Sequence, residues 1–189
     1  MRPSEAAHRR TSKNKAGAII FPRIIERRPR RGDMHPLNGR AVRAILRQIP
    51  LEYLYGLSRI ELRARTSDVG VPFGQYRRDE KAIILYSLPS LWIFPSLNPT
   101  MRHSLSRFYA KIEPTPEGLV CVTWPKDCLM SLWFYCEVMA HELGHHYRWQ
   151  YRHRNGRKGS RVDEEIVADL HAKRLTDQIL QKGRTCKAM

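Results

Sequence analysis

The sequence predicts an α+β domain in which a small, mostly antiparallel sheet packs on two helices. Three observations predict it: short β-type segments fill residues 59–124, a long amphipathic helix follows them, and a second helix comes near the end. A length of 189 residues suits one domain with a full core. Neither a membrane span nor a secretory signal is visible, and the four cysteines form no CxxC pair. We therefore expect a cytoplasmic protein with reduced cysteines.

The N-terminal residues 1–36 are predicted to form a disordered basic arm. They hold ten Lys/Arg against three acidic residues, include RRPRRGD at 27–33, and show no sustained apolar period. A single domain is expected to span residues 37–189.

The first elements of that domain follow from their apolar patterns. Residues 37–49 predict a short helix, and residues 59–65 (RIELRAR) alternate like a strand. Residues 80–88 (EKAIILYSL) are typical of a buried strand, after a Gly-containing turn region at 69–76. A loop then connects this strand to a hairpin predicted over residues 105–124.

Two helices complete the predicted fold. Asp127 is a suitable N-cap for a long helix from Cys128 to about Tyr151. The basic loop RHRNGRKGSR separates it from a second helix, which is expected to begin near residues 160–163 and to end near Gln181. Apolar residues recur in the first helix at three- and four-residue steps: Leu129, Leu132, Trp133, Cys136, Ala140, Leu143 and Tyr147.

The motif HELGH at 141–145 lies inside the long helix and predicts a catalytic zinc site with one ion. His141 and His145 project from the same face one turn apart, so both rings can reach one ion at about 2.0–2.1 Å. Glu142 points about 100° around the helix, where it can act as general base toward metal-bound water. Gly144 leaves room for another backbone to approach closely.

A catalytic site needs a third protein ligand and an open position for water. Glu165 is the candidate ligand, and it begins EIVAD on the second helix. Asp169 lies one turn later on the same face, where it would accept the free ring N–H of a ligating histidine. Glu164 and His171, which share a different face of that helix, remain alternative ligands.

These motifs carry a resemblance. HELGH, followed twenty residues after His145 by ExxAD, resembles the gluzincin peptidases, especially the short intracellular branch of ImmA/IrrE-like proteins. The likeness covers roughly residues 60–180 and implies a minimal zincin-like metallopeptidase domain, with Glu165 as zinc ligand and Asp169 as partner of His141. It also implies an intracellular endopeptidase whose protein substrate is regulatory, such as a DNA-bound repressor. A ligating His171 would instead make the site similar to the SprT branch.

Other polar residues near the motif receive weaker assignments. His146 points away from the ion and is expected to be structural, while His153 is a possible substrate contact. The transition state needs a hydrogen-bond donor toward the developing oxyanion. Five residues could supply this donor, and their spacing in the sequence does not favour any one of them. These are Tyr76, His103, Tyr147, Tyr151 and His153.

The charge of the chain supports a second hypothesis. The net charge is +16, and residues 147–161 combine six Arg/Lys with three aromatics and no acidic residue. Such a surface attracts nucleic acid or an acidic protein. The alternative function is thus a nucleic-acid-binding protein with a structural or relic zinc site, whose binding weakens steeply with salt. Predicted contacts with substrate or nucleic acid are Arg148, Arg152, His153 and Arg154.

Overall fold

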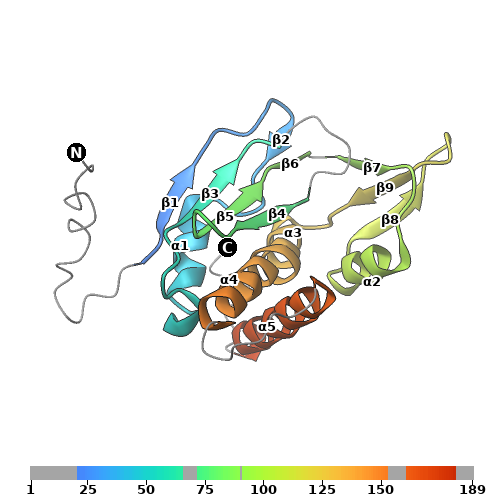
Figure 1. Cartoon of the computed structure of the whole chain (residues 1–189). Coiled ribbons are helices and arrows are strands. Elements are labelled where there is room, and N and C mark those ends of the chain that lie inside the picture. The colour runs from blue at the N-terminus through green and yellow to red at the C-terminus, as the bar shows by residue number, and fades with distance from the viewer. Residues whose placement is uncertain (1–20, 66–71, 90, 153–160, 182–189) are drawn as a thin grey trace, which may run out of the picture.

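A computed structural model describes residues 21–65, 72–89, 91–152 and 161–181. Its main layer is a four-stranded sheet, and helices cover one face of this sheet (Figure 1). The fold is α+β, as the sequence predicts. In spatial order the strands of this sheet are β1 (Arg23–Glu26), β3 (Arg59–Arg63), β5 (Ala82–Tyr86) and β4 (Gly74–Arg77).

The direction of the strands differs from the expectation of a mostly antiparallel sheet. β3 pairs in parallel with both β1 and β5, and only β4 is antiparallel to its neighbour β5. The prediction was wrong for this sheet because alternation within one strand carries no information on the direction of its neighbours. The connection between β1 and β3 is long and contains a helix, which is the usual crossover between parallel strands.

The boundary of the basic arm is also corrected. β1 and the short strand β2 (Asp33–Met34) both lie within residues 21–36, so this stretch belongs to the folded domain. The backbone of Ile24 pairs with that of Ile60, and its side chain packs against the core. The four residues of β1, directly before the arginine-rich run at 27–31, are too few to show an apolar period. Residues 1–20 lie outside the described part of the chain.

The helix α1 (Gly39–Leu46) forms where the sequence predicts a short helix. The side chain of Asn38 accepts a hydrogen bond from the backbone N–H of Ala41 at 2.8 Å, which caps the first turn. Val42 and Ile45 point into the core beneath the sheet. A 3-10 turn, Leu51–Tyr53, follows before β3 begins.

The middle of the chain contains more regular structure than the sequence predicts. The connection predicted as a loop holds β6 (Leu88–Pro89) and β7 (Trp92–Phe94), and α2 (Pro99–Arg107) takes up the start of the predicted hairpin. Asn98 caps α2 by accepting from the N–H of Met101, and a proline in the first turn favours a helix start. The hairpin itself is shorter, with strands β8 (Lys111–Pro114) and β9 (Val120–Thr123).

One continuous helical run crosses beneath the sheet and carries the HELGH motif. It consists of α3 (Asp127–Trp133), a π-helical segment (Phe134–Met139) and α4 (Ala140–Arg152). The predicted N-cap was wrong, because Lys126 occupies that position and makes no side-chain cap. Asp127 instead lies in the first turn, where a carboxylate complements the helix dipole.

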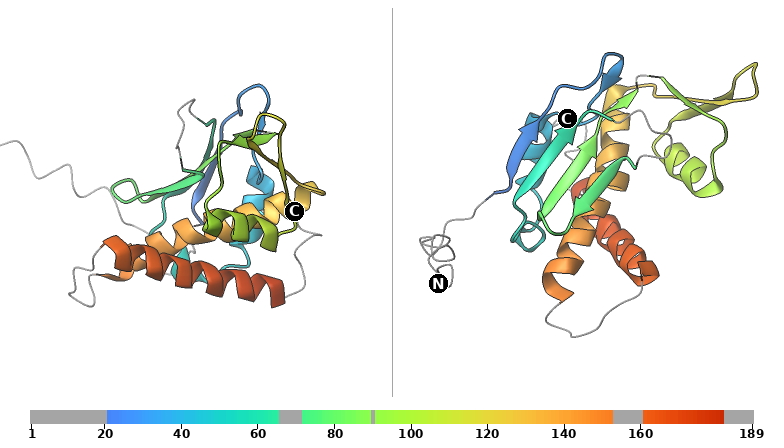
Figure 2. Two further views of the ribbon diagram at one scale, coloured as in Figure 1. Left: turned by 90° about the vertical axis from the view of Figure 1, so that its right-hand side faces the viewer. Right: turned by 45° about the horizontal axis from the view of Figure 1, so that its top comes forward.

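The last described helix, α5 (Arg161–Gln181), packs along α4 on the side away from the sheet (Figure 2). Within the described residues, no helix is both long and apolar enough to cross a membrane. The core lies between the sheet and the helical run, and its largest fully buried side chains include Trp92, Trp133, Phe134, Tyr135, Ile60, Leu62, Ile83 and Leu85.

Candidate metal centre

Three side chains from two helices converge at the contact between α4 and α5. The Nε2 atoms of His141 and His145 are 3.0 Å apart. The Glu165 Oε2 atom lies 3.3 Å from His141 Nε2 and 3.5 Å from His145 Nε2. These atoms form a nearly equilateral triangle, and the three residues are a group that could hold a metal ion.

Asp169 fixes the orientation of one imidazole ring. Its Oδ1 lies 2.8 Å from Nδ1 of His141, so a neutral ring that donates from Nδ1 presents the lone pair of Nε2 toward the triangle. Burial and the neighbouring His141 both lower the pKa of His145, which favours its neutral ring. Neutral imidazole is the form that binds metals.

Gly144 sets the distance between the two helices. A Cβ atom added to Gly144 would lie 2.6 Å from the carbonyl oxygen of Ala168 and 2.8 Å from its Cα. The two backbones are thus in contact, and Ala168 is fully buried. Only glycine at this position lets α5 bring Glu165 to the histidines of α4.

Gly144→Ala is therefore expected to destabilise the protein and to weaken metal binding. Overpacking costs about 1–3 kcal/mol, against a gain of up to about 1 kcal/mol from the better helix former. Urea unfolding and metal titration would measure both effects. Because the contact is with the backbone of Ala168, adding Ala168→Gly should not restore either property. Full restoration by that second change would contradict this account.

Glu142 stands beside the triangle and is buried against β4. A Cβ atom added to Gly74 would lie 3.1 Å from Glu142 Cγ and 2.7 Å from Val138 Cγ1, so glycine is needed here. Burial raises the pKa of Glu142 to about 7, and a hydrogen bond with the backbone of Tyr76 opposes this rise. The carboxylate thus lies between the edge strand and the metal group.

His146 is structural, as expected from its direction on the helix. It is fully buried, and its Nε2 donates to the carbonyl oxygen of Tyr55 at 3.0 Å. Its Nδ1 then accepts from the hydroxyl of Tyr76 at 3.1 Å. Burial lowers the pKa of His146, in keeping with the neutral ring. This side chain joins α4 to β4 and to the turn after Leu51–Tyr53.

The two alternative third ligands are engaged in other contacts. His171 Nδ1 is 2.8 Å from the Tyr53 hydroxyl, and its ring packs against Tyr147 at 4.4 Å between centroids. Glu164 faces Arg78, with 3.6 Å between Oε2 and Nη2. Among the described residues, the structure groups Glu165 rather than either of these with the two histidines.

The metal group opens into a cavity of about 470 Å³. β4 forms one wall with Gly74, Gln75 and Tyr76, and two arginines also line it. Arg148 follows His145 by one turn of α4, and its Nε is buried without a hydrogen-bond partner among the described residues. Arg78 lies over the ring of Trp149 at 4.2 Å. The cavity thus combines the metal group with two guanidinium groups and with the carboxylate of Glu164, which faces Arg78.

Among the other predicted contacts that the structure describes, only Tyr76 reaches the cavity. Tyr76 lines it but donates its hydroxyl to His146, Tyr147 packs on His171, and Tyr151 donates to the carbonyl of Glu52. His103 is exposed on α2. Arg152 ends α4, while His153 and Arg154 lie outside the described residues.

Sequence reasoning missed the wall formed by β4, including Gly74, and by Arg78 directly after it. Gly and Pro in VGVPFGQY favour a turn, so the sequence predicted a turn where β4 begins. The available signal was the run GQYR directly before the acidic turn that leads into β5, an arrangement typical of a hairpin.

No family model, curated protein or solved structure matches this chain. The chemistry of the site is therefore the basis for assigning a function.

Proposed function

We propose that this protein is a zinc-dependent endopeptidase, with a zincin-like domain of the gluzincin type similar to ImmA/IrrE-like proteins, that cleaves a protein substrate inside the cell. The observation that carries the proposal is the triangle of His141, His145 and Glu165, with the buried Glu142 beside it. Two imidazole nitrogens and one carboxylate oxygen are a set that catalytic zinc sites use.

The spacing of the triangle fits zinc. Ligand atoms at about 2.0–2.1 Å from a tetrahedral ion lie about 3.3 Å from one another, and the three separations are 3.0, 3.3 and 3.5 Å. Nitrogen ligands also favour zinc over magnesium or calcium, which prefer oxygen. A zinc ion, when bound, supplies Lewis acidity that makes water nucleophilic at neutral pH and polarises a carbonyl group.

Glu142 is proposed as the general base and acid. Its carboxylate takes a proton from the attacking water and returns that proton to the leaving amine. Burial raises the pKa of Glu142, which favours a carboxyl group that can hold the proton between the two transfers.

The cavity wall suggests how a peptide is held. β4 is the edge strand of the four-stranded sheet, so its outer edge can pair with an extended peptide by strand addition. Arg148, whose buried Nε has no hydrogen-bond partner among the described residues, favours a substrate with an acidic or other hydrogen-bond-accepting group near the cleaved bond. A regulatory or nucleic-acid-associated protein would be a suitable substrate class.

Metal removal tests the proposal. We expect the purified chain to hold about one zinc ion and to cleave peptides of a protein digest library, with new termini identified by mass spectrometry. A zinc chelator should abolish cleavage, and zinc should restore it where magnesium does not. Cleavage that survives removal of all metal would contradict the proposal, as would a chain that binds no zinc.

A further inference from the structure

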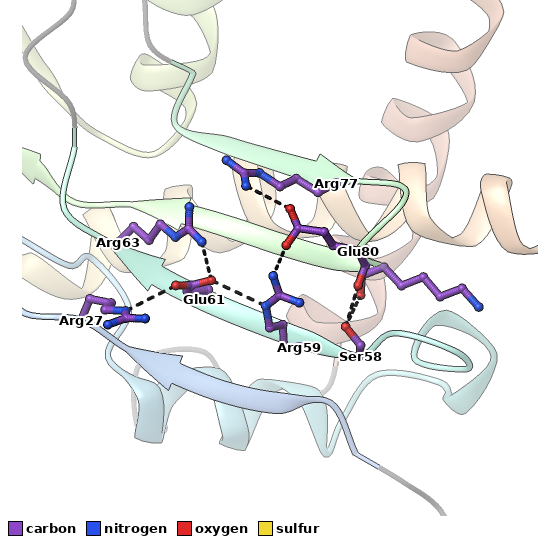
Figure 3. A network of polar contacts seen from close by, with 8 residues as sticks. Arg27, Ser58, Arg59, Glu61, Arg63, Arg77 and Glu80 are labelled. Carbon is purple, nitrogen blue, oxygen red and sulfur yellow. Dashed lines mark hydrogen bonds and ion pairs between the residues drawn. The ribbon is translucent and has the colours of Figure 1, made fainter. Parts of the chain in front are cut away.

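The outer face of the four-stranded sheet, turned away from the helices, carries two rows of arginines (Figure 3). Directly paired residues of neighbouring strands point to the same side, so the register places Arg23, Arg59 and Arg77 in one row. Arg27 and Arg63 lie in a second row, four residues or about 13 Å further along the strands. These five residues are called the arginine face.

Glu61 lies between the two rows and holds three of these guanidinium groups. Its side chain is only 4 % exposed and lies 2.8 Å from Arg63, 3.4 Å from Arg27 and 3.6 Å from Arg59 (Figure 3). The hydrogen bond from Arg63 lowers the pKa of Glu61, which therefore remains ionised. The carboxylate fixes the heads of long side chains that would otherwise be free to rotate.

Glu80, in the turn between β4 and β5, holds the other end of the first row. It pairs with Arg77 at 3.0 Å and also with Arg59. The hydrogen bond from Arg77 lowers the pKa of this carboxyl group too. Five guanidinium groups against two carboxylates leave the face with a net charge of +3.

The arginine face is open to a partner. No described helix covers this side of the sheet in any of the three views (Figures 1 and 2). The side chain of Arg27 is 68 % exposed, and those of Arg59, Arg63 and Arg77 are 26–35 % exposed. The loop that follows β1 carries three more exposed arginines, Arg28, Arg30 and Arg31.

We propose that the arginine face binds the sugar–phosphate backbone of a nucleic acid. Guanidinium groups bind phosphate oxygens in a bidentate manner, and fixed guanidiniums lose less entropy on binding. A stable protein interface would instead need an apolar or aromatic centre. Ile25 and Tyr86 are both partly buried and Ile84 is fully buried, and the other residues beside the arginines offer no such centre. Contacts with phosphate groups do not need an apolar or aromatic centre.

This site is separate from the proposed peptidase centre. Along β4, Gly74 and Tyr76 face the cavity, while Arg77 faces the opposite side of the sheet. The two activities can therefore be tested independently. A nucleic acid held on one side of the sheet would keep the cavity on the other side near proteins bound to the same nucleic acid.

The test compares two triple variants of the full chain with the same change of charge. R23Q/R59Q/R77Q removes one row of the face and leaves Glu61 paired with Arg27 and Arg63. R40Q/R43Q/R47Q removes three exposed arginines from α1, on the other side of the sheet. Fluorescence anisotropy would measure the Kd for a labelled 20-base-pair duplex at several salt concentrations.

For the face variant we expect Kd to rise about tenfold or more, and the slope of log Kd against log salt to fall by about 2–3. The α1 variant should change Kd less than about threefold. Equal losses in the two variants would mean that net charge alone matters and would overturn the proposal. Displacement of the duplex by polyglutamate at equal charge concentration would overturn the assignment to nucleic acid.

A second pair of variants guards against misfolding. R23E/R77E leaves all three partners of Glu61 in place, and R40E/R43E is its match on α1. Thermal unfolding would confirm that each variant is folded. Weaker duplex binding in R23E/R77E than in R40E/R43E is the expected result, and the reverse order would overturn the proposal.

Discussion

Replacing Glu142 by glutamine is expected to slow peptide hydrolysis by a factor of about 10²–10⁴, the usual contribution of a general acid–base group. Glutamine has nearly the same shape, so it fits against Gly74 as glutamate does, but it cannot accept a proton at neutral pH. Because Glu142 is not one of the three converging side chains, the zinc content should stay unchanged.

Glu137→Gln is the matched control for this experiment. Glu137 lies five residues earlier in the same helical run, where it accepts from Ser104 and pairs with Arg107 instead of lining the cavity. Its replacement should leave the rate of cleavage nearly unchanged. If Glu142→Gln retained zinc and cleaved as fast as the parent chain, the proposed role of Glu142 would be wrong.

The second large effect is expected at the third ligand. Glu165→Ala removes the only oxygen from the triangle and leaves two histidines, so zinc affinity should fall by more than the roughly 10–100-fold typical of losing an outer hydrogen-bond partner. Competition with a fluorescent chelator would measure the affinity. Cleavage activity should be lost in parallel, since a two-histidine site holds the ion weakly.

His171→Ala distinguishes the two possible third ligands. It removes the contact with the Tyr53 hydroxyl and the packing on Tyr147, so a modest loss of stability is expected. Zinc affinity should stay close to that of the parent chain. Loss of zinc in His171→Ala together with retention in Glu165→Ala would transfer the ligand role to His171.

Helical patterns allowed much of the site to be predicted. His141 and His145 are four residues apart, and Asp169 follows Glu165 by the same interval, so each pair shares a helix face whatever the rest of the fold does. Both helices had clear limits in the sequence. The structure then brings these four side chains together where α4 meets α5.

The surroundings of the site could not be predicted, because they depend on contacts between segments far apart in sequence. Gly74 appears in a turn-like run, and its place against Glu142 is visible only once β4 lies beside α4. The alternation of RIELR correctly places Glu61 on the side opposite Ile60 and Leu62. It does not reveal that arginines from two strands enclose this carboxylate, because strand order is a long-range property.

The π-helical segment Phe134–Met139 determines the angular phase of the metal ligands. Each residue of an α-helix rotates the following side chains by about 100° around the helix axis. A π-helical turn contains more residues than an α-helical turn, so it changes the direction in which the side chains after it point. Trp133, on one side of this segment, is anchored in the core, and His141, on the other, points at α5. Deleting one residue between them would turn both imidazoles away from Glu165. The number of residues in this segment therefore matters as much as their chemistry, and an insertion or deletion here would be more harmful than a substitution.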